Sequence, residues 1–180
     1  MSDELIARVA RRARDQRTQT DMGSVSVPII GPRLTDSAAA TSENLLGFAV
    51  PDLLKAVYRQ VGNGGFGPGY GLIGLIGGAE DDRGRNAVQL YELYSSSDPE
   101  DPGWKWPEAL LPICHWGCAI YSCIECKTDG FPIVVFDPNM HDESWLRCFL
   151  AQQRNLESWL SAWADGLKLW NEMYGERDEI

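Results

Sequence analysis

The segment Pro51–Gly71 limits the possible folds of this chain more than any other, because it joins an amphipathic helix to a glycine-rich loop. Pro51 suits the first helical position, and Gly62 suits the left-handed residue that ends a helix. The helix is predicted over residues 51–61, where apolar residues recur at helical spacing. These residues are Leu53, Leu54, Val57, Tyr58 and Val61. In the loop, Phe66 and Tyr70 are expected to fold back onto the core.

The glycine-rich loop does not have the features of a phosphate-binding loop. Residues 62–71 contain six glycines but no lysine, serine or threonine. A phosphate loop needs a Lys to reach the phosphates and a hydroxyl to reach Mg²⁺. A dinucleotide loop follows a strand and opens a helix, whereas this loop follows a helix. The pattern therefore favours a structural loop over a nucleotide site.

Four stretches of the sequence carry a family resemblance. They are YRQVGNGGFGPGYGLIGL, LLPICHWGCAIYSCIEC, FPIVVFDPN and LESWLSAWADG, and they span the chain from about Thr35 to Gly166. In this order they resemble the SMI1/KNR4 proteins, also called the SUKH superfamily. The resemblance implies an α+β domain that binds other proteins and is not an enzyme. Many bacterial members are immunity proteins that neutralise a cognate toxin, often a nuclease, and fungal members regulate cell-wall synthesis and signalling.

Charge and composition argue against some classes of function. The chain has 180 residues, which suits one domain, and a formal net charge of −10, which argues against nucleic-acid binding. No apolar stretch is long enough to cross a bilayer, and the charged start has no apolar signal region. We therefore expect a cytoplasmic protein without membrane insertion. Its 5 cysteines are expected to be reduced thiols.

The first 34 residues lie outside the resemblance. Leu5, Ile6, Val9 and Ala13 favour a short basic helix, for which a frayed or solvated state is expected in preference to membrane or partner binding. A short strand at Val25–Ile30 is an option in the linker that follows. The expected organisation is an N-terminal helix and linker at 1–34, one domain at 35–172 and a polar tail at 173–180.

The predicted fold class is α+β, with N-terminal helices, a mostly antiparallel central sheet and a C-terminal Trp-rich helix packed on that sheet. Helices are expected from Thr35 or Asp36 to Leu46 and over 85–95, and a buried strand over Tyr70–Ile76. Further strands are expected at Leu111–His115, Cys118–Cys126, Phe131–Asp137 and 145–150. Asn155 is expected to cap the last helix. Its apolar stripe would be Leu156, Trp159, Leu160, Trp163, Leu167 and Trp170.

The segment from Glu80 to Glu108 is the most acidic part of the chain, with eight acidic and three basic residues. Two tryptophans lie beside prolines and carboxylates near its end. Exposed Trp among acids is typical of an interface, but both rings could equally pack onto the domain. If this stretch is the contact face, the partner-binding residues are Glu80, Asp81, Asp82, Asp98, Glu100, Asp101, Trp104 and Trp106.

The cysteines offer two other hypotheses. Cys123 and Cys126 have the spacing of a zinc pair, and Cys114 and Cys118 lie nearby in the sequence. In a continuous strand, however, Cys118 and Cys126 would point to one face and Cys123 to the other, so one metal could not bind all four. A thiol nucleophile such as Cys148 or Cys114, with His115 or His141, lacks both a nucleophile elbow and an electropositive setting. We therefore expect no catalytic residues, no metal and no cofactor.

The resemblance, together with the acidic charge, thus implies an immunity protein for a basic, nuclease-type toxin. The alternatives are a regulatory or scaffold module linked to cell-wall synthesis or signalling, and a zinc-binding domain using the Cys114–Cys126 cluster.

Overall fold

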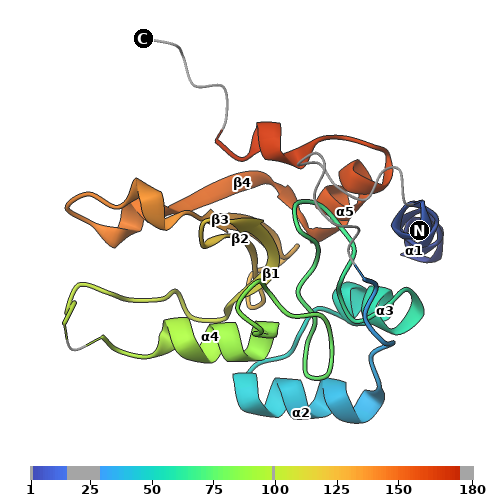
Figure 1. Cartoon of the computed structure of the whole chain (residues 1–180), viewed down its shortest axis with the longest axis horizontal. Coiled ribbons are helices and arrows are strands. Elements are labelled where there is room, and N and C mark those ends of the chain that lie inside the picture. The colour runs from blue at the N-terminus through green and yellow to red at the C-terminus, as the bar shows by residue number, and fades with distance from the viewer. Residues whose placement is uncertain (1, 16–28, 99, 175–180) are drawn as a thin grey trace.

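The computed structural model describes residues 2–15, 29–98 and 100–174, which form an α+β fold as predicted (Figure 1). The predicted polar tail and the option of a strand at Val25–Ile30 lie largely outside these residues. The helices are α1 (Ser2–Arg14), α2 (Asp36–Leu46), α3 (Asp52–Gln60), α4 (Ala87–Ser95) and α5 (Leu156–Ala164). The strands are β1 (Leu110–Gly117), β2 (Ile120–Glu125), β3 (Pro132–Phe136) and β4 (Phe149–Asn155).

The four strands form one sheet in chain order, and each neighbouring pair is antiparallel. This confirms the three strands predicted between residues 111 and 137. The strand predicted at 145–150 begins later, at Phe149. Residues Trp145–Cys148 instead form a 3₁₀ turn, in which the hydroxyl of Ser144 accepts a hydrogen bond from the backbone N of Leu146 at 3.3 Å.

Helices pack around this sheet in two groups. Helix α4 lies on β1 with α2 against it, while α5 packs beside β3 and β4 (Figure 1). Helix α2 has the predicted ends: the Thr35 hydroxyl accepts from the backbone N of Ala38, and Gly47 is left-handed with φ of 75°. None of the helices in the described residues has the length and apolar character that a membrane span requires.

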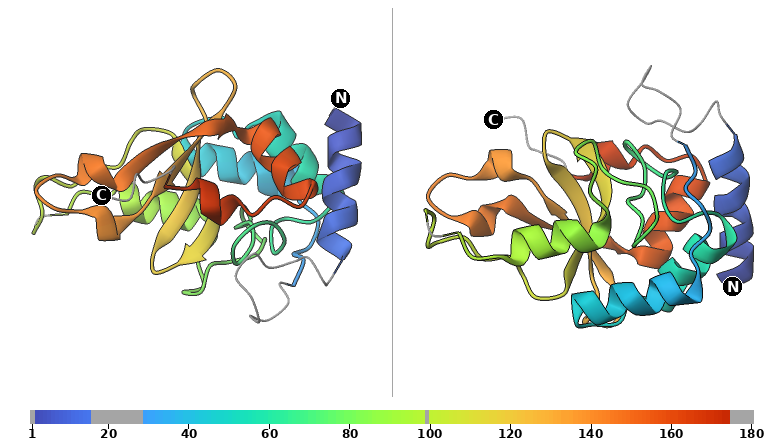
Figure 2. Two further views of the ribbon diagram at one scale, coloured as in Figure 1. Left: turned by 90° about the horizontal axis from the view of Figure 1, so that it is seen from above. Right: turned by 60° about the horizontal axis from the view of Figure 1, so that its bottom comes forward.

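The N-terminal helix α1 packs on the domain, which corrects the expectation of a frayed or solvated helix. Its apolar residues Leu5, Ile6, Val9 and Ala13 are buried against α5 and α3. Arg8 also donates hydrogen bonds to Asp165 at 2.5 Å and to the hydroxyl of Ser161 at 2.8 Å. Both views in Figure 2 show α1 along one edge of the molecule beside these helices.

The predicted helix over residues 51–61 is confirmed as α3, but its ends differ from the prediction. Pro51 is the residue before the first helical residue, and Gly62 does not adopt a left-handed conformation. Gly62 is instead required by close packing, because a Cβ there would lie 2.7 Å from the backbone oxygen of Gly31.

The glycine-rich loop leads into a buried turn rather than the predicted strand. Of the segment Tyr70–Ile76, only Leu72 forms a β-bridge, with Cys114. The Asn63 side chain takes the place of a neighbouring strand: it accepts from Leu75 N at 2.9 Å and donates to the Ile76 carbonyl at 3.2 Å. Phe66 is buried as expected, but the Tyr70 side chain is 39% exposed.

The C-terminal helix buries Trp159 and Trp163 but ends at Ala164, earlier than predicted. Asn155 caps α5 as predicted, by accepting from Ser158 N at 2.9 Å. Gly166, with φ of 97°, follows the helix. Trp170 therefore lies in a separate 3₁₀ turn, where its ring packs against Trp116 with the ring centroids 5.7 Å apart.

Candidate protein-interaction site

The acidic stretch does not form one continuous face but contributes to two separate hollows. We call the first the Trp104 hollow; its lining includes Leu93, Tyr94, Asp98, Asp101, Trp104 and Trp145. We call the second the His115 hollow; its lining includes Tyr70, Asp81, Asp82, His115, Cys118 and Trp170. The turn between β1 and β2 borders both, since Cys118 lines one hollow and Ala119 the other. The structure therefore brings together Asp98, Asp101 and Trp104, and separately Glu80, Asp81 and Asp82.

The Trp104 hollow has a volume of about 470 Å³ and combines aromatic walls with carboxylates. The indole of Trp104 is half-buried and meets that of Trp145 edge to face, with centroids 4.7 Å apart. Two hydrogen bonds fix these rings: Trp104 Nε1 donates to the Tyr94 carbonyl at 2.8 Å, and Trp145 Nε1 donates to Asp101 Oδ2 at 2.6 Å. Asp101 thus holds the wall in place, while Asp98 is exposed.

Trp106 belongs to the core beneath this hollow. Its side chain is 6% exposed, and its ring stacks on Tyr94 with centroids 4.8 Å apart. Its Nε1 donates to the Leu110 carbonyl at 2.7 Å. Trp106 can therefore support the surface but not touch a partner. Glu100 is exposed and does not line the hollow.

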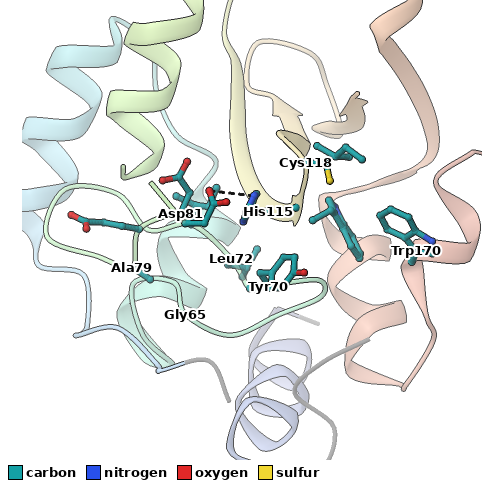
Figure 3. A pocket seen from close by; sticks show the side chains of 15 residues that line it. Gly65, Tyr70, Leu72, Ala79, Asp81, His115, Cys118 and Trp170 are labelled. Atoms are coloured by element: carbon teal, nitrogen blue, oxygen red, sulfur yellow. Dashed lines mark ion pairs between the residues drawn. The ribbon is translucent and has the colours of Figure 1, made fainter. Parts of the chain in front are cut away.

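The His115 hollow has a volume of about 640 Å³ and is shown in Figure 3. Asp81 is buried at its base, where it accepts hydrogen bonds from Tyr121 Oη at 3.0 Å and from the backbone N of Arg83 and of Arg85, both at 2.9 Å. Asp82 behaves differently, because its side chain is 59% exposed. Glu80 is also exposed.

His115 on β1 is the least satisfied polar group of this hollow. Its side chain is 5% exposed, and its Nε2 has no hydrogen-bond partner among the described residues. The nearest acid, Asp82 Oδ1, lies 3.6 Å from Nε2, which is too long for a hydrogen bond. Burial lowers the pKa of His115, although Asp82 and Asp81 oppose this shift. The imidazole is therefore neutral at pH 7, and Nε2 can accept a hydrogen bond when the ring proton is on Nδ1.

Sequence reasoning had considered His115 only as a metal ligand or a base. A lone histidine in an apolar strand gives no sign that a carboxylate from the loop at 80–82 will lie beside it. It also missed Tyr70, Tyr94, Trp145 and Trp170 as walls of the hollows. In the sequence, only the nearby glycines and acidic residues point to these regions. They do not indicate which aromatic rings come together in the hollows.

The cysteines do not converge. Cys114, Cys123, Cys126 and Cys148 are buried and Cys118 is exposed. Within residues 2–15, 29–98 and 100–174, no three Cys, His, Asp or Glu side chains gather as metal ligands would. Burial raises the pKa of Cys126 to about 12 and also raises the pKa of Cys123 and of Cys148. These thiols are therefore protonated at pH 7 and are weak nucleophiles.

The model of the SMI1 / KNR4 family (SUKH-1) matches residues 33–160. No curated protein and no solved structure matches the chain.

Proposed function

Since the chain belongs to the SMI1/KNR4 family (SUKH-1), a family of protein-interaction domains, we propose that it is an immunity protein. It binds a basic toxin of the nuclease type in the cytoplasm and neutralises it without catalysis. We place the interaction domain at residues 35–172. The exposed acids of the segment 80–108, together with Trp104, form a contact face that extends over both hollows, while Asp81, Asp101 and Trp106 hold that face in shape.

The Trp104 hollow is the observation that carries this proposal. Aromatic rings in a partly covered pocket are typical anchors of protein interfaces, and Trp and Tyr are enriched among them. Here the rings of Trp104 and Trp145 are fixed by hydrogen bonds, so little side-chain entropy is lost when a partner docks. Leu93, with 46% of its side chain exposed, extends the apolar surface at the rim.

Charge supports a basic partner. The net charge of the chain is −10, and the segment 80–108 has eight acidic residues against three basic ones. Complementary charge mainly speeds association and selects the partner, whereas buried rings slow dissociation. A basic nuclease domain would supply the complementary positive charge, since it carries basic residues for its own phosphate contacts.

The test begins with the tagged full-length chain, used to capture partners from a host lysate at low and at moderate salt. A captured basic protein is then expressed alone and together with this chain. We expect the partner alone to stop growth and co-expression to restore it. A captured partner that does not affect growth, or a cell-wall or signalling protein in its place, would contradict the toxin proposal and favour a regulatory role.

Matched charge variants locate the contact face. One triple variant carries Asp82→Asn, Asp98→Asn and Glu100→Gln, all exposed acids of the segment 80–108. Its control carries Glu4→Gln, Asp129→Asn and Glu157→Gln, which remove the same charge from exposed positions elsewhere. The first variant should slow association and flatten its salt dependence, while the control should change both less. Equal effects would mean that only net charge matters.

A further inference from the structure

We propose that the His115 hollow is a binding site for an arginine side chain presented by a protein partner. The identity of that partner depends on the proposed function, but the affinity of the hollow for a guanidinium group does not. The site consists of the unpartnered nitrogen of His115, the carboxylate of Asp82 and the rings of Tyr70 and Trp170.

The first observation is a buried nitrogen atom without a hydrogen-bond partner. His115 Nε2 is buried and has no hydrogen-bond partner among the described residues. A buried polar atom without a partner costs free energy, so such atoms are rare away from functional sites. The imidazole lines the hollow, and neighbouring rings fix it: the centroids of Tyr70 and Tyr121 lie 5.4 Å and 5.3 Å from its own. When the proton of the neutral imidazole is on Nδ1, Nε2 can accept a hydrogen bond from a donor that enters the hollow.

The second observation is the charge beside that acceptor. Asp82 Oδ1 lies 3.6 Å from His115 Nε2, and the Asp82 side chain remains 59% exposed. Its neighbour Asp81 already accepts from Tyr121 and from two backbone N–H groups, so of these two carboxylates Asp82 is the one available to a ligand. The described lining includes Glu80, Asp81 and Asp82 but no Lys or Arg. The hollow therefore favours a cation.

The geometry selects a guanidinium in preference to a compact ammonium. Its planar fork carries several N–H donors, so it can bond to a carboxylate oxygen and to a second acceptor close by at the same time. It also stacks on aromatic faces. Figure 3 shows Tyr70 beside His115 and Trp170 across the hollow. The volume of about 640 Å³ is sufficient for one long side chain.

Backbone contacts fix the position of Tyr70. Its N–H donates to the His115 carbonyl at 2.9 Å, which ties the glycine-rich loop to β1. The ring lies over Gly117, where an added Cβ would come within 3.0 Å of Tyr70 Cε2. The ring therefore stays beside the imidazole, half-exposed, as one wall of the hollow.

The probe for this site is N-acetyl-L-arginine amide, titrated into the full chain and followed by NMR of the His115 imidazole and the indole N–H groups. We expect the signals of His115 and Trp170 to shift and those of Trp104 and Trp145 to stay. The neutral isostere N-acetyl-L-citrulline amide should bind about tenfold more weakly or worse, because hydrogen bonds between charged groups contribute on that order.

Variants complete the test. Asp82→Asn should reduce binding of the arginine probe about tenfold, whereas Asp98→Asn in the Trp104 hollow, an equal charge change, should leave it unchanged. His115→Gln, which can keep an acceptor, should bind better than His115→Leu. No shift at His115, equal binding of the citrulline probe, or unchanged binding by Asp82→Asn would overturn the proposal. Probe binding without a toxin partner would instead refute the proposed function and leave this site standing.

Discussion

The hydroxyl of Tyr121 on β2 donates a 3.0 Å hydrogen bond to the buried carboxylate of Asp81, forty residues earlier in the chain. This bond joins the sheet to the acidic loop that borders the His115 hollow. Asp81 also orders that loop by accepting from the backbone N of Arg83 and of Arg85. The Tyr121–Asp81 pair therefore couples the stability of the fold to the shape of the hollow.

Tyr121→Phe should lower the free energy of unfolding by about 1–3 kcal/mol, since it leaves a buried carboxylate without its side-chain donor. Urea denaturation followed by tryptophan fluorescence measures this change. The control is Tyr70→Phe, which removes a hydroxyl from a half-exposed ring and should cost less. Equal losses in the two variants would mean that the Asp81 bond adds no stability.

Protonation of His115 should destabilise the fold at mildly acidic pH. Burial lowers its pKa below the ordinary value of 6.5, with Arg83 acting in the same direction and Asp82 and Asp81 opposing it. Between the lowered pKa and 6.5, the unfolded chain therefore binds a proton that the folded chain does not. Stability is thus complete above 6.5 and is lost as the pH falls below it.

Urea denaturation at about pH 7.5 and about pH 5.5 measures this effect. The drop in unfolding free energy should be smaller in His115→Gln than in the unaltered chain, because the variant has no imidazole to protonate. Carboxylates contribute equally to both chains over this range. The same drop in both would assign the pH dependence to other groups.

Gly65→Ala should be far more destabilising than Gly47→Ala. Both glycines have a left-handed backbone, with φ of 81° and 75°. Around Gly47 nothing lies within 4 Å of an added Cβ, whereas at Gly65 the Cβ would meet the Ile29 carbonyl oxygen at 1.9 Å. Gly47→Ala should therefore cost about 1 kcal/mol from backbone strain alone.

Gly65→Ala should cost a further ~1–3 kcal/mol or more, because the backbone must move. Denaturant midpoints of the two variants give the comparison directly. Similar midpoints would show that the segment around Ile29 moves aside without cost, and that the close approach does not constrain the loop.

Helix α1 should contribute measurably to stability. Ile6 is buried, so Ile6→Ala should lower the unfolding free energy by about 2–5 kcal/mol, as large-to-small changes in a core do. Arg11→Ala, at an exposed position of the same helix, should have little effect. A loss below about 0.5 kcal/mol for Ile6→Ala would indicate that α1 detaches in solution.

Substitutions of the two neighbouring tryptophans, Trp104 and Trp106, should have different effects. Trp106→Ala should cost about 3–5 kcal/mol of stability, because its buried ring packs on Tyr94 and Phe136. Trp104→Ala should cost less, since its ring is half-buried, and should weaken partner binding more than it weakens the fold. Thermal denaturation and binding measured on the same preparations test this. A larger stability loss for Trp104→Ala would contradict the assignment.

Local signals in the sequence were sufficient for elements whose ends are set by neighbouring residues. Thr35 and Gly47 delimit α2, and Asn155 starts α5, because caps act within one turn of the helix. The antiparallel strands followed from β-branched and apolar runs separated by turns. The turn before β3 closes by a hydrogen bond from Phe131 N to the Thr128 carbonyl at 3.0 Å.

Features that depend on distant partners were not predictable. Residues 70–76 are as apolar as a strand, but the Asn63 side chain satisfies part of the backbone that a neighbouring strand would satisfy. The N-terminal helix has the pattern of a weak amphipathic helix, and nothing local shows that α5 covers it. Trp104 and Trp106 have the same local context, and Tyr94 and Phe136 contact both rings. The additional contact of Trp106 with the distant Phe149 is not visible in the local sequence.

The contact between α1 and α5 has a consequence for synthesis of the protein. The apolar face of α1 is made early, but α5, which covers part of that face, comes about 150 residues later. At ribosomal rates of about 5–20 residues per second, the part of the face that α5 covers stays exposed for roughly 8–30 s. The nascent chain must therefore avoid aggregation during this interval, and closure of the fold has to await the end of translation of α5.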